Sequence, residues 1–161
     1  MGILEQPDWF KKSLAVPFTE HHVEVYETKI HYLLWSDDSN KPGLVLVHGN
    51  GAHAHWWTFI APFFMDHYQV LAIDLSGAGD SAHRDKYTAE GFADEVIAAA
   101  EHANFGSDVI IVGHSFGGFI TLKTGLIHRD KLSGVVLVDS AVRPPDFEWE
   151  RDPRSSPIKA K

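Results

Sequence analysis

Ser115 is the residue of this sequence whose surroundings most clearly indicate chemistry. It is the centre of Gly113-His114-Ser115-Phe116-Gly117, a G-x-S-x-G pattern that follows an apolar run and precedes a helical pattern. A serine on such a sharp turn carries its hydroxyl above the strand end, where the first N–H groups of the helix also point. Glycines two residues before and after it give the neighbouring backbone room. The pattern predicts a nucleophilic serine; the alternative is a glycine-rich turn that holds an inert one.

An earlier segment with two glycines, His48 to His53 with the sequence HGNGAH, can supply a partner for that nucleophile. Attack by Ser115 on a carbonyl group forms a tetrahedral oxyanion, which needs two N–H donors. The amide of Phe116, the residue after the nucleophile, is the first candidate, and the amide of Asn50 is the second. The alternative is a loop that its glycines tighten without any role in chemistry.

A third segment, Asp74 to Ser81 with the sequence DLSGAGDS, is interpreted as structural. The Asp74 carboxylate can cap local backbone amides, and Gly77 and Gly79 allow the chain to turn. A phosphate-binding loop is the functional alternative. The segment lacks the Lys-Ser/Thr ending of a P-loop and the third glycine of a dinucleotide fingerprint, so the structural interpretation is favoured.

A serine hydroxyl needs a base to take its proton at neutral pH. His128 is the one histidine that follows Ser115, and a helix between them would separate the two by about 20 Å. We therefore expect His128 to be a helix C-terminal residue rather than the base. Asp139, at the end of the next apolar run, is a weak candidate for the acid of a catalytic triad, because an aspartate there more often orders a loop.

Other residues near these motifs are predicted to have supporting roles. His48 is expected to order its own loop, and His114 to pack beside the turn and contact substrate. His53 and His55 form a His-x-His pair that could bind metal, but a third ligand is lacking, so no metal site is predicted. For His55, solvent exposure or a packing role is favoured over the role of a replacement base. Trp56 is expected in an apolar wall of the substrate pocket, with core packing as the alternative.

Apolar segments predict the sheet that must position these residues. Four of them are short, continuous and rich in β-branched residues, as strands covered on both faces are. These four segments are 43–48, 68–74, 108–113 and 132–139. Two further segments, 22–26 and 29–35, predict an antiparallel hairpin with its turn at Glu27-Thr28.

Helical patterns lie between the four runs, as the crossover connections of a parallel sheet require. We expect a short helix over 58–67, a second from an N-cap at Thr88 to about Gly106, and a third from just past Ser115 to about His128. The predicted fold class is therefore α/β, with an N-terminal antiparallel hairpin followed by four parallel strands and crossover helices.

The composition is that of one globular domain. The chain has 161 residues, too few for two ordinary domains, and 44% of them are hydrophobic. The 22 acidic residues outnumber the 14 basic ones, and the net charge of -8 argues against nucleic acid as a partner. Residues 1–142 are predicted to form the core domain, and residues 143–161, with charge and proline but no period, a linker or disordered tail.

Cysteine usage and the N-terminus indicate the compartment. The chain has no cysteine, which removes disulfides, thiolate catalysis and Cys-type zinc sites, and which is typical of a reducing cytoplasm. The N-terminus has no basic start followed by an apolar run, so a signal peptide is not predicted. No apolar stretch approaches the length of a membrane span. We therefore expect a cytoplasmic protein with no membrane partner.

The motifs HGNGAH, DLSGAGDS and GHSFGG, each after a predicted strand and in this order, together resemble those of the α/β-hydrolase family. The resemblance covers roughly residues 18–142. It implies a serine hydrolase in which Ser115 is the nucleophile and Asn50 and Phe116 form the oxyanion hole. Branches that act on alkyl halides or epoxides use an aspartate instead, so Ser115 implies esters, thioesters, lactones, amides or activated C–C bonds. The implied partner is a small-molecule substrate, and no cofactor is implied.

The family order is Ser, then acid, then His, and the resemblance places a lid and two more strands, with the Asp and the His, beyond the last residue of this chain. We therefore expect a truncated gene product, a fragment or a natural short form whose acyl-enzyme chemistry is incomplete. Binding of a ligand or partner without turnover, and an inactive fragment, are the alternatives. The unpaired strand edge of such a chain predicts poor solubility or self-association.

Overall fold

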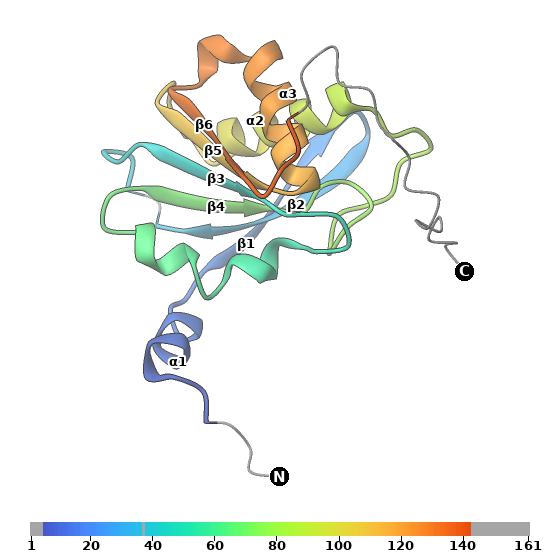
Figure 1. The fold of residues 1–161 in the computed structure, drawn as a ribbon. Helices are drawn as coiled ribbons and strands as arrows, with labels where there is room; N and C mark the ends of the chain where they lie inside the picture. The colour runs from blue at the N-terminus through green and yellow to red at the C-terminus, as the bar shows by residue number, and fades with distance from the viewer. Residues whose placement is uncertain (1–4, 37, 143–161) are drawn as a thin grey trace, which may run out of the picture.

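The computed structural model describes residues 5–36 and 38–142, and one six-stranded sheet runs through them (Figure 1). The strands are β1 (Thr19–Val25), β2 (Thr28–Trp35), β3 (Gly43–Val47), β4 (Gln69–Ile73), β5 (Val109–His114) and β6 (Gly134–Val138). They lie in the order β1-β2-β4-β3-β5-β6. The first two are antiparallel to their neighbours, and the other four are parallel to one another. The predicted α/β class is confirmed; the tail predicted at 143–161 lies outside the described residues.

The hairpin turns one residue earlier than predicted. Tyr26 and Glu27 form the turn, with φ of 50° and 60°, and Thr28 already pairs with Val25. Two-residue hairpin loops of this kind need both central residues in the left-handed region, because that twist matches the strands they join. Tyr and Glu do not favour this conformation, so no residue preference indicates the position of the turn, and the prediction of a turn at Glu27-Thr28 was wrong.

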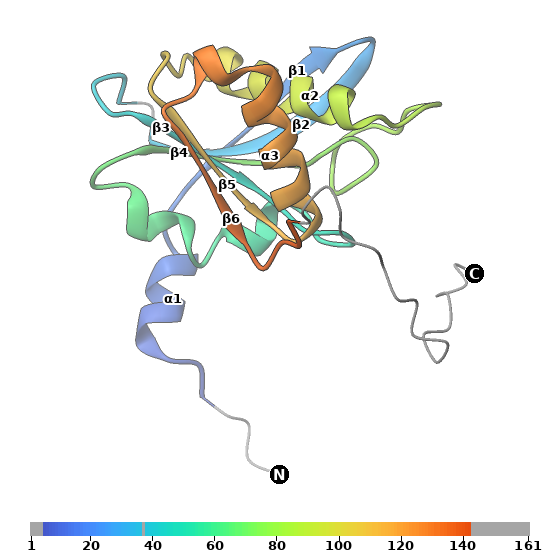
Figure 2. The same cartoon turned by 45° about the horizontal axis from the view of Figure 1, so that its top comes forward.

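Helices cover the sheet on both faces (Figures 1 and 2). On one face, α2 (Ala89–His102) and α3 (Phe116–Ile127) lie side by side over the larger hydrophobic cluster. On the other lie α1 (Asp8–Leu14) and the 3-10 helices η1 (Ala54–Trp57) and η2 (Ala61–Phe64). Among the described residues, no helix combines the length and the hydrophobicity that a bilayer crossing requires.

The helices differ from prediction in three places. The single helix expected over 58–67 is not formed; that range holds the four-residue η2 and η1 ends just before it, because Pro62 at the start of η2 has no N–H to continue a longer helix. The second predicted helix ends at His102 rather than near Gly106, and Asn104, with φ 57°, takes the left-handed position assigned to glycine. The short α1 was missed, since seven residues carry too little periodicity to indicate a helix.

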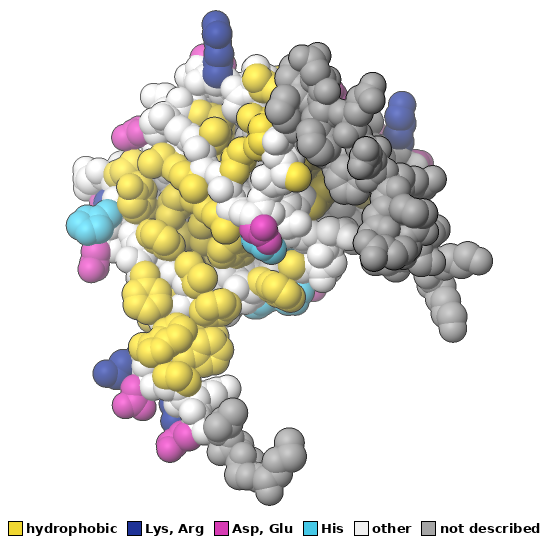
Figure 3. All heavy atoms as spheres, in the orientation of Figure 1, with side chains coloured by type: hydrophobic (Ala, Val, Ile, Leu, Met, Phe, Trp, Pro, Cys, Tyr) yellow, Lys and Arg dark blue, Asp and Glu magenta, His cyan; other side chains and the backbone are white. Residues whose placement is uncertain are grey.

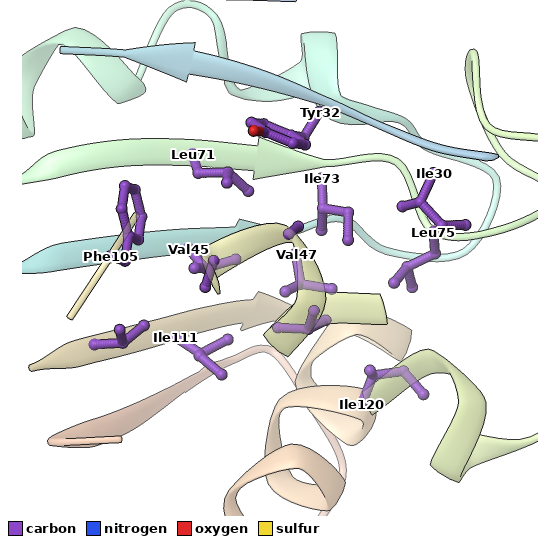
Figure 4. Close-up of a cluster of buried hydrophobic side chains, with 14 of the residues drawn as sticks. Ile30, Tyr32, Val45, Val47, Leu71, Ile73, Leu75, Phe105, Ile111 and Ile120 are labelled. Atoms are coloured by element: carbon purple, nitrogen blue, oxygen red, sulfur yellow. The ribbon is translucent and has the colours of Figure 1, made fainter. Parts of the chain in front are cut away.

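The packing of the core explains why the sequences of the central strands are continuously apolar. Val45 and Val47 of β3 point toward α2 and α3 and pack with Ile120 of α3 in the larger cluster (Figure 4). Leu44 and Leu46 of the same strand belong to the second cluster, under η1 and η2. Both faces of the strand are buried, so no position is left for a polar side chain.

Among the exposed apolar side chains, those of two regions lie beside one another. On β6, at the edge of the sheet, Val135, Val136 and Val138 are 40%, 47% and 41% exposed, and no further strand pairs with β6 within the part of the chain that the structure describes. On α1 and η2, Trp9 contacts Phe63, and both are exposed. Figure 3 shows hydrophobic side chains gathered where α1 joins the rest of the molecule. Self-association through the β6 edge stays a prediction.

A 3-10 helix, η3 (Arg129–Lys131), connects α3 to β6. It completes the crossover that places β6 beside β5, parallel to it, with Val138 opposite His114. The residue after each of these two strands therefore lies at the same edge of the sheet, and that edge carries the candidate site.

Candidate active site

The chain makes a sharp turn at Ser115, between β5 and α3. Ser115 has φ 53° and ψ −115°, a backbone conformation that residues other than glycine rarely adopt. Its amide donates to the Val138 carbonyl (2.9 Å), and its own carbonyl accepts from the Ser140 hydroxyl (2.9 Å) and the Gly118 amide (3.0 Å). The neighbouring strand and the first turn of α3 thus hold the strained turn in place at the C-terminal edge of the sheet.

Two glycines bring the loop after β3 against this turn. A Cβ on Gly117 would lie 2.4 Å from the carbonyl oxygen of His48. A Cβ on Gly49 would lie 3.3 Å from the Cβ of Ser115 and 2.8 Å from the ring of His114. Only residues without a side chain permit these approaches. The loop that follows β3 therefore passes directly beside Ser115.

Two backbone amides near Ser115 are free to bind a ligand. Phe116 is the first residue of α3, and Asn50 is exposed in the segment Gly49–His53, which we call the β3 loop. Neither amide donates a hydrogen bond within residues 5–36 and 38–142. Free N–H groups, those at the start of a helix above all, favour a negatively charged oxygen. These are the two oxyanion donors that the sequence predicts, and their role stays a prediction.

His48 ties the start of the β3 loop to the segment after β4. Its Nδ1 donates to the Gly49 carbonyl (2.8 Å), and its Nε2 accepts the Leu75 amide proton (3.1 Å). This pattern requires the neutral ring with its proton on Nδ1. Burial lowers the pKa of His48 and so keeps the ring neutral. The prediction that His48 orders its own loop is confirmed.

Asp74 ties down the other end of the β3 loop. Its buried carboxylate accepts the amide protons of Ala54 (2.5 Å), the residue after the loop, and of Asp80 (3.0 Å). The prediction that Asp74 caps local amides is confirmed. It also bonds to Nδ1 of His31 (2.8 Å), a residue that the sequence did not single out. Only the pairing of β2 with β4, which places the two residues together, identifies this partner.

The contact changes the pKa of both residues. The hydrogen bond to Asp74 raises the pKa of His31, although burial acts against it. Burial alone would raise the pKa of Asp74, but the hydrogen bonds from His31, Ala54 and Asp80 outweigh it, and the pKa of Asp74 is lowered. The carboxylate that holds the β3 loop is therefore charged at neutral pH.

The stability of the fold should depend on pH through this pair. His31, with a folded-state pKa raised above 6.5, stabilises the fold fully below pH 6.5, and this contribution is lost as the pH rises through the folded-state value. Asp74, with a pKa lowered below 3.8, stabilises the fold above pH 3.8, and this contribution is lost as the pH falls through its folded-state value. The pair should contribute most between roughly pH 4 and 6.5.

Urea unfolding of the wild type and of Asp74→Asn, from about pH 3 to about pH 9, checks this expectation. The asparagine removes both pKa shifts, so the difference in free energy of unfolding should shrink toward both ends of the range. A difference that is the same at every pH would contradict it.

Ligand-type atoms of His31, Asp74 and Asp80 lie within 4.8 Å of one another, as in a metal site. The Asp74 oxygens, however, already take part in three hydrogen bonds. A Cβ on Gly79 would lie 2.2 Å from Asp74 Oδ2, so backbone covers the carboxylate on that side. A cation would have to displace these contacts, and the arrangement is that of a hydrogen-bond network.

A pocket of about 540 Å³ opens between the β3 loop, the segment after β4 and the start of α3. Aromatic side chains, leucine and histidines line it beside small loop residues; the larger residues are His48, Asn50, His53, Leu75, His83, Tyr87, Phe92 and Phe116. Among the residues that the structure describes, no Asp, Glu, Lys or Arg lines the pocket. Ser115 itself is not in the lining, but Phe116, the residue after it, and Gly49, which packs against it, both are, so the pocket opens next to Ser115.

The other predicted site residues lie at different distances from this pocket. Trp56 is 58% exposed on η1 and is not in the pocket lining. His55 contacts Phe18 rather than the pocket. His114 is half-buried with its ring against the β3 loop, and Asp139 is exposed directly after β6, with φ 48°. The substrate contacts of Trp56 and His114 and the acid role of Asp139 stay predictions.

No histidine of the described residues is hydrogen-bonded to the Ser115 hydroxyl. His128 lies at the far end of α3, where its Nε2 bonds to Asp94 (2.8 Å), as expected of a histidine that does not reach the site. No other histidine in the described ranges forms a hydrogen bond with the Ser115 hydroxyl. Among the described residues, the arrangement therefore combines a strained serine with two free amides.

Comparison with known proteins adds the family context. A family model described as alpha/beta hydrolase fold matches residues 42–156. A pimeloyl-[acyl-carrier protein] methyl ester esterase of Vibrio cholerae is 35% identical over 109 residues, which are 68% of this chain and 41% of the relative. A 2-hydroxy-6-oxo-6-(2'-aminophenyl)hexa-2,4-dienoic acid hydrolase of Metapseudomonas resinovorans is 33% identical over 61% of this chain and 35% of the relative.

Solved structures agree with this result. The crystal structure of a membrane phospholipase A matches with a TM-score of 0.73 and 30% identity, over 86% of this chain and 44% of that one. The chain thus spans less than half the length of each of these proteins.

Proposed function

Since this chain belongs to the α/β-hydrolase fold family, we propose that it serves the hydrolysis of an ester-like or activated carbonyl substrate through an acyl-enzyme at Ser115. A fold by itself does not assign a reaction, so the proposal rests on the site. The observation that carries it is the strained turn at Ser115, at the C-terminal edge of the sheet, with the β3 loop against it and two free amides beside it.

In the proposed reaction, Ser115 Oγ attacks the carbonyl carbon while its proton passes to a base. The amides of Asn50 and Phe116 stabilise the negative charge that develops on the carbonyl oxygen. Collapse of the tetrahedral intermediate breaks the bond to the leaving group, which takes up the proton, and leaves the acyl group on Ser115. Water then attacks this ester by the same steps, releases the acid and restores the hydroxyl.

The base is proposed to come from outside residues 5–142. No histidine of the described residues bonds to Ser115, and none follows His128 in the 161-residue sequence. The acid that orients the base would come with it, and Asp139 is the weaker candidate for that acid. The described residues would then supply the nucleophile and the oxyanion donors but not the base.

The substrate class follows from the nucleophile and the pocket. Serine forms an acyl-enzyme with esters and activated carbonyl compounds, and two relatives are named as a methyl ester esterase and a dienoic acid hydrolase. The uncharged pocket lining suits an apolar acyl or alcohol group. His114 is proposed to contact the reacting end of the substrate, and Trp56 only a substrate that extends beyond the pocket.

Ligand binding without turnover is the second candidate function. The specific observation in its favour is that no histidine of the described residues reaches the Ser115 hydroxyl. The pocket and the free amides would then hold a carbonyl or carboxylate ligand that is not cleaved.

Ser115→Ala is expected to abolish labelling by a fluorophosphonate probe. The oxyanion donors should keep the wild-type chain reactive at Ser115 even without its base, because loss of one triad member in serine proteases leaves about 10³-fold catalysis over water. Free imidazole can stand in for the base, so it should speed the labelling of the wild type and not of the variant. Mass spectrometry of the labelled peptides and p-nitrophenyl acetate hydrolysis measure both effects.

Ser133→Ala removes an exposed serine outside the site and serves as the matched control, with labelling equal to that of the wild type. Equal labelling of Ser115→Ala and the wild type would contradict Ser115 as the nucleophile. A wild-type chain that stays unlabelled with and without imidazole would favour ligand binding without turnover.

A further inference from the structure

His31, in β2, belongs to a buried hydrogen-bond network that ends at the β3 loop. Its backbone amide donates to the Ser81 hydroxyl (2.7 Å), and its carbonyl accepts the amide proton of Asp74 (2.9 Å). The Ser81 hydroxyl in turn donates to the Asp74 carbonyl (2.6 Å). These three bonds fix the backbone of β2 to that of the segment after β4.

The side chains extend this network to the β3 loop. His31 Nδ1 bonds to Asp74 Oδ2 at 2.8 Å, and Asp74 Oδ1 accepts the amide proton of Ala54 at 2.5 Å. The two side chains are 1% and 0% exposed, so water does not compete for these bonds. Ala54 directly follows His53, the last residue of the β3 loop. One carboxylate therefore links His31 to the loop beside Ser115.

An imidazole at position 31 lowers the stability of the fold, so packing alone does not account for a histidine there. The Nε2 atom of His31 is buried and has no hydrogen-bond partner within the described ranges. A buried polar atom without a partner destabilises a fold, and an apolar side chain of similar size would avoid the penalty. What an apolar side chain cannot do is donate a hydrogen bond from the Nδ1 position to Asp74.

The Asp74 carboxylate needs such a donor to keep its orientation. Its two oxygens serve different segments, because Oδ1 holds Ala54 while Oδ2 holds Asp80 and His31. Rotation of the carboxylate about its side-chain bonds would weaken the contact to Ala54. The hydrogen bond from His31, on a different strand, opposes that rotation.

We propose that His31 is a positioning residue for the β3 loop. That the loop supplies an oxyanion donor to Ser115 rests on the proposed function, whereas the way in which His31 holds the loop does not. His31 fixes the Asp74 carboxylate, the carboxylate fixes the Ala54 amide, and the Ala54 amide sets where the loop places the Asn50 amide beside Ser115. His31 itself does not touch the substrate.

Amide hydrogen exchange of the full chain, measured by NMR, tests this link. In His31→Leu, the protection of the Ala54 amide should fall at least about tenfold more than that of Val45 and Leu71 in the sheet. His31→Asn retains an N–H close to the Nδ1 position and should restore the protection of Ala54. His22→Leu is the matched control, because His22 is exposed on β1 with its ring 5.0 Å from that of His31, and it should behave as the wild type.

Unchanged protection of Ala54 in His31→Leu would overturn the inference, because the loop would then be held without His31. A fall of the same factor at Ala54, Val45 and Leu71 would overturn it too, because it would show a general loss of stability. If His31→Leu does not fold, His31→Gln takes its place with the same expectations, since its amide reaches the Nε2 position instead of Nδ1.

A second measurement separates this inference from the proposed function. The rate of fluorophosphonate labelling at Ser115 should fall in His31→Leu and recover in His31→Asn. If the wild-type chain is not labelled at all, the hydrolase proposal fails, and hydrogen exchange still decides whether His31 holds the β3 loop. If labelling persists in His31→Leu while Ala54 loses its protection, the loop is held by His31 but does not serve Ser115, which overturns the positioning role.

Discussion

Replacing Gly117 by alanine is expected to lower the free energy of unfolding by about 3 kcal/mol or more. The added Cβ would lie 2.4 Å from the carbonyl oxygen of His48 and 2.5 Å from that of Val47. Both are backbone atoms at the end of β3, a central strand with a partner on each side, so they cannot give way. α3 must move instead, and Ser115 at its N-terminus moves with it.

Urea unfolding measures the loss of stability in Gly117→Ala, and fluorophosphonate labelling measures the displacement of Ser115. Gly106→Ala is the matched control, because no atom lies within 4 Å of a Cβ there, and its effect should stay within about 0.5 kcal/mol. A Gly117→Ala variant as stable as the wild type would show that α3 does not pack against the end of β3 as closely as the structure has it.

Glu95→Ala is expected to have a comparable effect, through a buried ion pair. The fully buried Glu95 carboxylate accepts from Arg84 Nε (2.7 Å) and from the Ser76 amide (2.9 Å). The other nitrogens of the guanidinium donate to the carbonyls of Val25 and Tyr26 at the hairpin. Without Glu95, the guanidinium of Arg84, whose side chain is only 11% exposed, loses its counter-charge. Removal of one partner from a buried pair costs about 3–5 kcal/mol, and we expect a loss of that size.

Glu101→Ala provides the comparison for Glu95→Ala in urea unfolding. Glu101 pairs with Lys131 at the surface, where the two side chains are 57% and 44% exposed. Exposed pairs contribute little to stability, so Glu101→Ala should leave the unfolding midpoint almost unchanged. Equally small effects of the two variants would mean that Arg84 finds water or another partner once Glu95 is gone, and the ion pair would not be the link between α2 and the hairpin.

The parts of the structure that the sequence predicts are those that depend on interactions within a few residues or within one strand. Every residue of β3 and β4 is buried, so burial on both faces leaves a continuous apolar run that identifies each strand. The turn at Ser115 follows from sterics within a few residues, because the glycines around it are needed where α3 approaches β3 and β5. Its position was therefore evident before any contact was known.

The parts that the sequence does not predict depend on contacts between distant segments. His31 acquires a role only because β2 pairs with β4 and meets Asp74 there. Arg84 and Glu95 likewise join a loop to a helix with no pattern that links them in the sequence. The sequence around Trp56 does not distinguish a side chain that lines a pocket from one at the surface, because this depends on the direction of η1.

The order of the strands in the sheet differs from their order along the chain, and this difference determines when each strand can pair during synthesis. β1 and β2 are neighbours in both orders and meet through a two-residue turn, so this hairpin can form within microseconds. β3, in contrast, pairs only with β4 and β5, which the ribosome makes later. The first partner of β3 is complete only once Ile73 has been made, and the second only once His114 has been made. Until then β3 has unpaired edges, which favour aggregation of the nascent chain.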